Sequence, residues 1–91
     1  MNITPSIKTI IVEDEQSAVN RLQKELKLLE HVRFDFQGIF ESVSDTVDWL
    51  KKGNEVDLIF MDIHLVDGLS FEIFNQAEVN CPVIFTTAYD E

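Results

Sequence analysis

Strand-like segments alternate along this chain with stretches whose apolar residues recur every three or four positions. The strand-like segments cover residues 8–12, 32–40, 56–61 and 83–85. The helix-like stretches between them cover residues 18–29, 43–52 and 71–77. Such an alternation predicts right-handed crossovers and an α/β fold, with a parallel sheet and helices on both of its faces.

The first two helices show signals for their faces and their ends. An amphipathic helix of roughly four turns is predicted from apolar residues at spacings of three and four: Ala18, Val19, Leu22, Leu26 and Leu29. Either Ser42 or Ser44 is suited to cap the second helix, and Gly53 can adopt the left-handed conformation that ends it. We therefore expect a second helix between these residues.

Length, charge and cysteine content restrict the classes of function. The chain has 91 residues, enough for one domain over residues 1–91, and its net charge of −10 argues against direct binding of nucleic acid or an anionic membrane. One cysteine excludes an internal disulfide and fits a reducing compartment. The N-terminus lacks the pattern of a signal peptide, and the apolar runs are too short to span a bilayer. We expect a cytoplasmic protein.

Polar residues of particular kinds follow three of the predicted strands. Glu13 and Asp14 follow the first strand, Asp62 the third, and Thr87 the fourth. An acid at the end of one strand is commonplace, but the carboxyl ends of neighbouring parallel strands share one edge of the sheet, where ligands bind. Three carboxylates gathered there stay ionised only if a cation compensates them. The pattern favours Mg²⁺, a hard dication that prefers oxygen ligands.

Three sequence motifs carry a resemblance to a known family. They are Ile-Ile-Val-Glu-Asp-Glu at 10–15, Asp-Leu-Ile-Phe-Met-Asp-Ile at 57–63 and Val-Ile-Phe-Thr-Thr-Ala-Tyr at 83–89. In this order they resemble the receiver domains of two-component response regulators, most closely those of LytTR-type transcriptional regulators. The resemblance implies a flavodoxin-like doubly wound sheet with strand order 2-1-3-4, followed by a fifth strand in a complete receiver.

The resemblance also implies a role for each residue of the strand-end set. Asp62 would be the nucleophile that accepts a phosphoryl group from a sensor histidine kinase. Asp14 and Glu13 would bind Mg²⁺, together with Asp62 and the backbone carbonyl of His64. Thr87 would hydrogen-bond a phosphoryl oxygen and so report phosphorylation. Phosphoryl transfer rests on positioning and charge neutralisation, which is consistent with these roles.

The chain departs from the commonest receiver pattern in one loop and in length. Val66 and Ser70 stand where that pattern has proline and glycine, although Asp67 and Gly68 can still form a tight turn, so we expect a shifted loop and an intact site. The resemblance implies that the fourth helix, the fifth strand with its lysine and the fifth helix lie beyond Glu91. An effector domain, DNA-binding if the LytTR resemblance holds, would follow them.

Two further expectations follow from that interpretation. Without a fifth strand, the fourth strand exposes an apolar edge, so we expect self-association through this edge. Without the lysine, we expect slow phosphorylation, because the transition state lacks one cation.

Two other functions remain as alternatives to a signalling domain without enzymatic turnover. One is a Mg²⁺-dependent, haloacid-dehalogenase-like phosphohydrolase, but such enzymes usually carry a second aspartate two residues beyond the nucleophile, where this chain has His64. The other is a receiver-like module that works by binding alone. The presence of all four groups, Glu13, Asp14, Asp62 and Thr87, argues against the second alternative.

Overall fold

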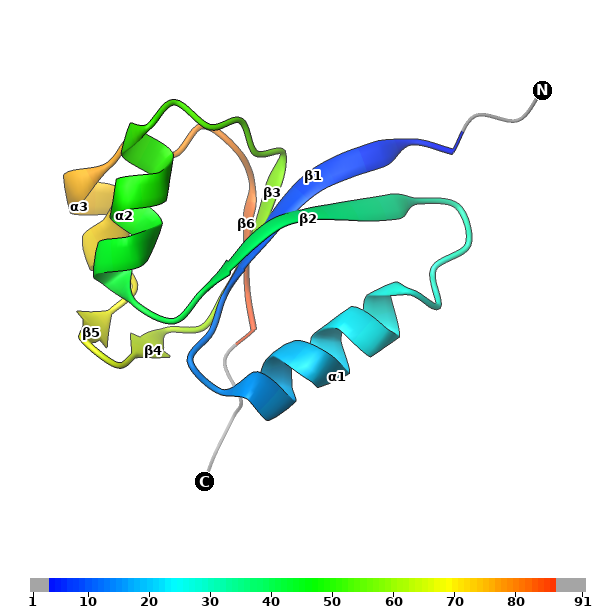
Figure 1. Ribbon diagram of the computed structural model, residues 1–91, viewed down its shortest axis with the longest axis horizontal. Helices are drawn as coiled ribbons and strands as arrows, with labels where there is room; N and C mark the ends of the chain where they lie inside the picture. The colour runs from blue at the N-terminus through cyan, green and yellow to red at the C-terminus, as the bar shows by residue number, and fades with distance from the viewer. Residues whose placement is uncertain (1–3, 87–91) are drawn as a thin grey trace.

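A four-stranded parallel sheet forms the centre of the molecule in the computed structural model, which describes residues 4–86 (Figure 1). The main-sheet strands are β1 (Ser6–Val12), β2 (Arg33–Phe40), β3 (Leu58–Met61) and β6 (Val83–Phe85). The helices are α1 (Gln16–Leu26), α2 (Val43–Lys51) and α3 (Glu72–Gln76). The strand order is β2-β1-β3-β6, where β6 is the fourth predicted strand. This confirms the predicted α/β fold and order.

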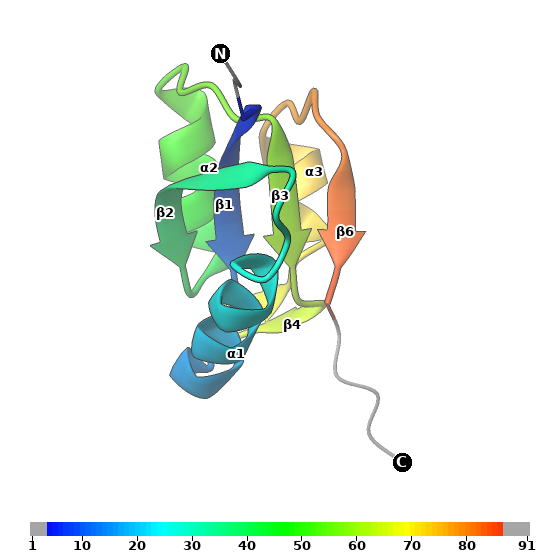
Figure 2. The same cartoon turned by 90° about the vertical axis from the view of Figure 1, so that its right-hand side faces the viewer.

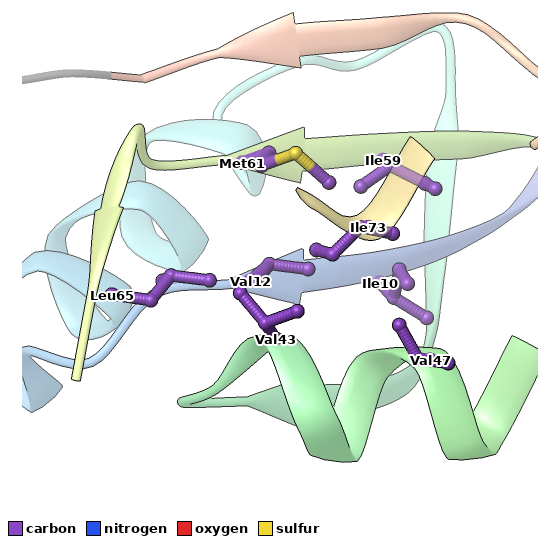
Figure 3. Close-up of a cluster of buried hydrophobic side chains, with 8 residues drawn as sticks. All are labelled: Ile10, Val12, Val43, Val47, Ile59, Met61, Leu65 and Ile73. Atoms are coloured by element: carbon purple, nitrogen blue, oxygen red, sulfur yellow. The ribbon is translucent and has the colours of Figure 1, made fainter. Parts of the chain in front are cut away.

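The helices cover opposite faces of the sheet, as Figure 2 shows, with α1 on one face and α2 and α3 on the other. On the α2 side, side chains from β1, β3 and both helices form the larger core (Figure 3). Its buried members are Ile10, Val12, Val43, Val47, Ile59, Met61, Leu65 and Ile73. The core facing α1 is smaller, with Ile11, Val19, Leu26 and Phe60. Burial on both faces explains why β1 and β3 are continuously apolar. No helix in the described part of the chain is long and apolar enough to cross a membrane.

Helix α1 ends at Leu26, one turn earlier than the periodicity predicted. The N–H groups of Leu28 and Leu29 donate to carbonyls three residues back, Glu25 and Leu26, at 3.1 and 3.2 Å, which is the tighter turn that often closes a helix. Leu29 is half-exposed there and does not join the core. The prediction of a fourth α-helical turn was therefore wrong.

A bulge in β2 reverses which side chains of the strand point to which face of the sheet. Thr9 lies opposite Phe36, whereas the next residue, Ile10, lies opposite Gly38, so one residue of β2 is left out of the register. Since neighbouring strand residues point to opposite faces, the shift turns Phe40 toward α2. A β carbon at Gly38 would lie 2.6 Å from the Phe40 ring, so this ring position requires glycine.

Helix α2 begins and ends with the residue types that the sequence indicated. The Ser42 side chain accepts a hydrogen bond from the Asp45 N–H at 3.0 Å, which selects Ser42 over Ser44 as the capping residue. Gly53 has φ +83°, a left-handed conformation that follows the helix.

Removing this cap should weaken the fold measurably. Ser42→Ala is expected to lower the free energy of unfolding by about 1 kcal/mol, because the Asp45 N–H loses its acceptor. Urea unfolding of the two variants Ser42→Ala and Ser44→Ala tests this. Equal losses in both would contradict the assignment of Ser42 as the cap.

The loop after β3 forms a small antiparallel hairpin that the sequence did not indicate. It consists of β4 (His64–Leu65) and β5 (Gly68–Leu69). The turn between them contains Asp67, and Gly68 follows with φ +141°. The hairpin lies beside the start of α2 (Figure 1).

Candidate metal centre

The backbone places the acids of β1 and β3 next to each other at the carboxyl edge of the sheet. Val12, the last residue of β1, pairs with Met61, the last residue of β3. The next residue of β3's segment, Asp62, donates its N–H to the Val12 carbonyl at 2.9 Å. Glu13 donates its N–H to the Phe40 carbonyl at 2.8 Å. The parallel register therefore positions the backbone of Glu13 beside that of Asp62.

Three carboxylates meet at this edge. One carboxylate oxygen from each of Glu13, Asp14 and Asp62 lies within 4.8 Å of the other two. Glu13 is buried, and the two aspartates are partly exposed. Like charges at this separation repel, so the arrangement is stable only with a bound proton or a cation.

Glu13 shows the consequence of this crowding most clearly. Burial raises the pKa of its carboxyl from 4.5 to about 7, and the nearby charges of Asp62 and Asp14 act in the same direction. A hydrogen bond from the Glu15 N–H, at 3.2 Å, opposes the shift. Near neutral pH, Glu13 therefore holds a proton part of the time, and a cation that binds here must displace it.

Asp62 is held in place through one of its two carboxylate oxygens. Its Oδ1 accepts a hydrogen bond from the Ile63 N–H at 2.8 Å. Within residues 4–86, no donor contacts Oδ2. This leaves one oxygen of Asp62 free for an incoming ligand.

A cavity of about 310 Å³ adjoins the carboxylates on the α1 side of the sheet. Its lining residues are Ile11, Glu13, Glu15, Ala18, Arg21, Leu22, Glu25, Asp62 and Thr86. Arg21 is the one basic residue among the described lining residues. The space is large enough for a small anion beside Asp62.

The structure describes one of the two remaining predicted site residues, His64, and not the other, Thr87. His64 lies in β4 with an exposed side chain, as expected of a residue that acts through its backbone, and the ligand role of its carbonyl stays a prediction. Thr87 lies outside the described residues. The described chain does reach Thr86, whose N–H donates to the Met61 carbonyl at 2.9 Å.

The altered loop after Asp62 forms a hairpin beside three carboxylates that still lie close together. Ser70, in place of the pattern's glycine, is buried and donates its N–H to the Ile63 carbonyl at 2.8 Å. Val66, in place of proline, is exposed in the hairpin turn. Val66 therefore replaces proline at an exposed position, whereas Ser70 buries a hydroxyl oxygen for which the described residues provide no hydrogen-bond partner.

The donor set fits a small, hard cation. Oxygen ligands from carboxylates suit Mg²⁺ and Ca²⁺, whereas zinc sites usually include nitrogen or sulfur. Within the described residues, only Glu13, Asp14 and Asp62 form a group with metal-ligand spacing. Three protein carboxylates leave further coordination positions open for water or a ligand oxygen.

Comparison with curated proteins finds sequence relatives of this chain. The chain is 35% identical over 88 residues to "Sensory transduction protein LytT" of Bacillus anthracis, an alignment that covers 93% of this chain and 35% of the relative. It is 34% identical over 87 residues to "Sensory transduction protein LytR" of Staphylococcus saprophyticus, covering 92% of the chain and 33% of the relative. The chain is therefore similar in sequence to one segment of these sensory transduction proteins.

This homology supports the response-regulator family that the three motifs resemble. The chain spans about a third of the length of these LytT and LytR relatives. A LytT protein of Bacillus cereus, 33% identical over 88 residues, gives the same coverage of 35%. No family model and no solved structure matches the chain.

Two residues near the site were not singled out from the sequence. Asp67 was interpreted only as a turn residue, yet its carboxylate contacts the start of α2. Arg21 lies on the polar side of an amphipathic helix, where a charge is usual. In both cases the function depends on which distant segment lies opposite, and periodicity carries no such signal.

Proposed function

We propose that this chain is the phosphoacceptor receiver domain of a two-component response regulator, with Asp62 as the acceptor and Mg²⁺ as the cofactor. The observation that carries the proposal is the group of three carboxylates at the ends of β1 and β3. Its occurrence in a homologue of LytT and LytR makes a signalling role the simplest interpretation. The proposed domain is a switch without enzymatic turnover of its own.

In this proposal, the free Oδ2 of Asp62 attacks the phosphorus atom of the donor. A phosphorus–oxygen bond forms, the phosphorus–nitrogen bond of a kinase phosphohistidine breaks, and its electron pair remains on the imidazole nitrogen. Bound Mg²⁺ neutralises charge on the phosphoryl oxygens and the carboxylates. Glu13 and Asp14 would hold the cation, and the Ile63 N–H fixes the orientation of the Asp62 carboxylate.

The partners follow from the same proposal. The phosphoryl donor would be a sensor histidine kinase, and the output would pass to an effector domain in the parent protein. The excess of acids in this chain argues against direct contact with DNA. The Thr87 hydroxyl and the His64 carbonyl complete the proposed set as phosphoryl and metal ligands.

Incubation with acetyl phosphate, followed by intact mass measurement, tests the proposal. We expect slow incorporation of one phosphoryl group that requires Mg²⁺ and stops when EDTA is added. Beryllofluoride, which mimics a phosphoryl group on a carboxylate, should bind under the same conditions. Incorporation that continues in EDTA, or failure of both reagents at saturating Mg²⁺, would contradict the proposed function.

We also propose that the chain self-associates through the edge of β6. In the described residues, β6 pairs only with β3, and its Ile84 and Phe85 side chains are 47% and 42% exposed. An apolar strand edge of this kind tends to pair with another chain. The net charge of −10 opposes this, so dimers should become more abundant as salt is added. Light scattering on eluting protein tests it, and a monomer at every salt and protein concentration would contradict it.

A further inference from the structure

The hairpin that follows Asp62 is attached to the rest of the molecule at three points. The Ser70 N–H donates to the Ile63 carbonyl at 2.8 Å and closes the loop. Leu65 is buried in the larger core, in the same cluster as Val43 of α2 (Figure 3). The third attachment is polar and involves the side chain of Asp67.

Asp67 binds the first turn of α2 with both carboxylate oxygens. Its Oδ1 accepts from the Val43 N–H at 2.7 Å, and its Oδ2 accepts from the Ser44 N–H at 3.1 Å. These hydrogen bonds lower the pKa of the Asp67 carboxyl, because they stabilise its ionised form. A carboxylate at this position also interacts favourably with the helix dipole. Asp67 and Ser42 therefore cap the same helix from different segments.

Three hydrogen bonds link β1, the start of α2 and the loop after β3 in a ring that includes the segments carrying Glu13 and Asp62. Glu13 is hydrogen-bonded to Phe40, three residues before Val43. Val43 is hydrogen-bonded to Asp67, which lies five residues after Asp62. Asp62 is hydrogen-bonded to Val12, the residue before Glu13. The contact between Asp67 and α2 therefore lies on a continuous path of covalent bonds and hydrogen bonds that joins the two acidic segments.

We propose that Asp67 is a positioning residue, which fixes the loop after the acceptor by capping α2 and transmits occupancy of the carboxylate group to the start of that helix. This inference rests on the proposed function, because it takes Mg²⁺ as the occupant. Under this inference, the start of α2 changes when the carboxylate group binds Mg²⁺. A partner that contacts the start of α2 would then distinguish the occupied from the unoccupied site.

Mg²⁺ titration followed by amide NMR tests the link in the whole chain. In the wild type, the Val43 and Ser44 amides should shift with the same midpoint as those of Asp14 and Asp62. In Asp67→Ala, the shifts at α2 should disappear and Mg²⁺ affinity should fall, because the loop after Asp62 loses its contact with α2.

Two further variants separate positioning from stability and from charge. Ser42→Ala also removes a cap from α2 but leaves the hairpin contact, so its Mg²⁺ affinity should match the wild type. Asp67→Asn removes the same charge as Asp67→Ala but keeps one acceptor oxygen for the Val43 N–H, so it should restore part of the affinity. Equal affinity losses in Asp67→Asn and Asp67→Ala would assign the effect to charge alone and overturn the inference.

The outcomes also separate the inference from the proposed function. If Asp14 and Asp62 respond to Mg²⁺ in the wild type but Val43 and Ser44 do not, the link through Asp67 is wrong and the metal site stands. If the amides of Asp14 and Asp62 do not respond to Mg²⁺, both the link through Asp67 and the proposed function are wrong.

Discussion

Replacing Asp62 by asparagine is expected to abolish phosphoryl incorporation from acetyl phosphate completely. An amide oxygen is a poor nucleophile, and no other carboxylate takes its position at the end of β3. The fold should survive, because an asparagine oxygen can still accept the hydrogen bond that the Ile63 N–H donates at 2.8 Å. Intact mass after incubation with Mg²⁺ and acetyl phosphate measures the effect.

Asp57→Asn is the matched control for this experiment. Asp57 precedes β3 at the opposite end of the strand, where its carboxylate accepts a hydrogen bond from the Lys8 N–H at 2.9 Å. This variant makes the same chemical change in the same segment and should be labelled like the wild type. Labelling of Asp62→Asn at the wild-type rate would show that another residue is the acceptor.

The second large effect concerns Glu13 and the pH dependence of stability. Because the pKa of Glu13 is raised from 4.5 to about 7 in the folded protein, the folded state holds this proton more tightly than the unfolded state. The resulting stability is fully present below pH 4.5 and is lost as pH rises to about 7. The loss should be on the order of 1–3 kcal/mol in metal-free protein.

Glu13→Gln removes this dependence while keeping an oxygen that accepts the Glu15 N–H hydrogen bond. Without metal, the variant should be more stable than the wild type at pH 8 and of similar stability near pH 4.5. Urea unfolding in EDTA at both pH values measures this. Adding Mg²⁺ at pH 8 should reverse the order, because cation binding stabilises the wild type by mass action.

Glu15→Gln is the matched control, since Glu15 is the exposed acid two residues along. It should keep the wild-type pH profile. A Glu13→Gln variant that is less stable than the wild type at pH 8 without metal would contradict the electrostatic account of the site.

The main elements were predictable because their signals are local. Strand-like segments at 8–12 and 56–61 identified β1 and β3, and the serines at 42 and 44 together with Gly53 marked the ends of α2. The parallel sheet then followed from the alternation of elements. Proximity of the three acids followed from the sheet, because strands that end in register bring their next residues together.

The features that were missed depend on contacts between distant segments. The bulge before Gly38 shows only in the pairing of β2 with β1, and the tight last turn of α1 shows only in its hydrogen bonds. The β4–β5 hairpin is held by α2 through Asp67, which lies 24 residues from Val43 in sequence. None of these leaves a periodic pattern in the sequence.

The most direct test of a metal centre at this edge is Mg²⁺ titration of the wild-type chain monitored by amide NMR at pH 8, where Glu13 is largely ionised. A metal centre should give saturable shifts that are largest at Glu13, Asp14 and Asp62, the three residues whose carboxylates lie within 4.8 Å of one another. Shifts that are absent, or that scatter over other acidic residues without saturating, would contradict a metal centre at the end of β1 and β3.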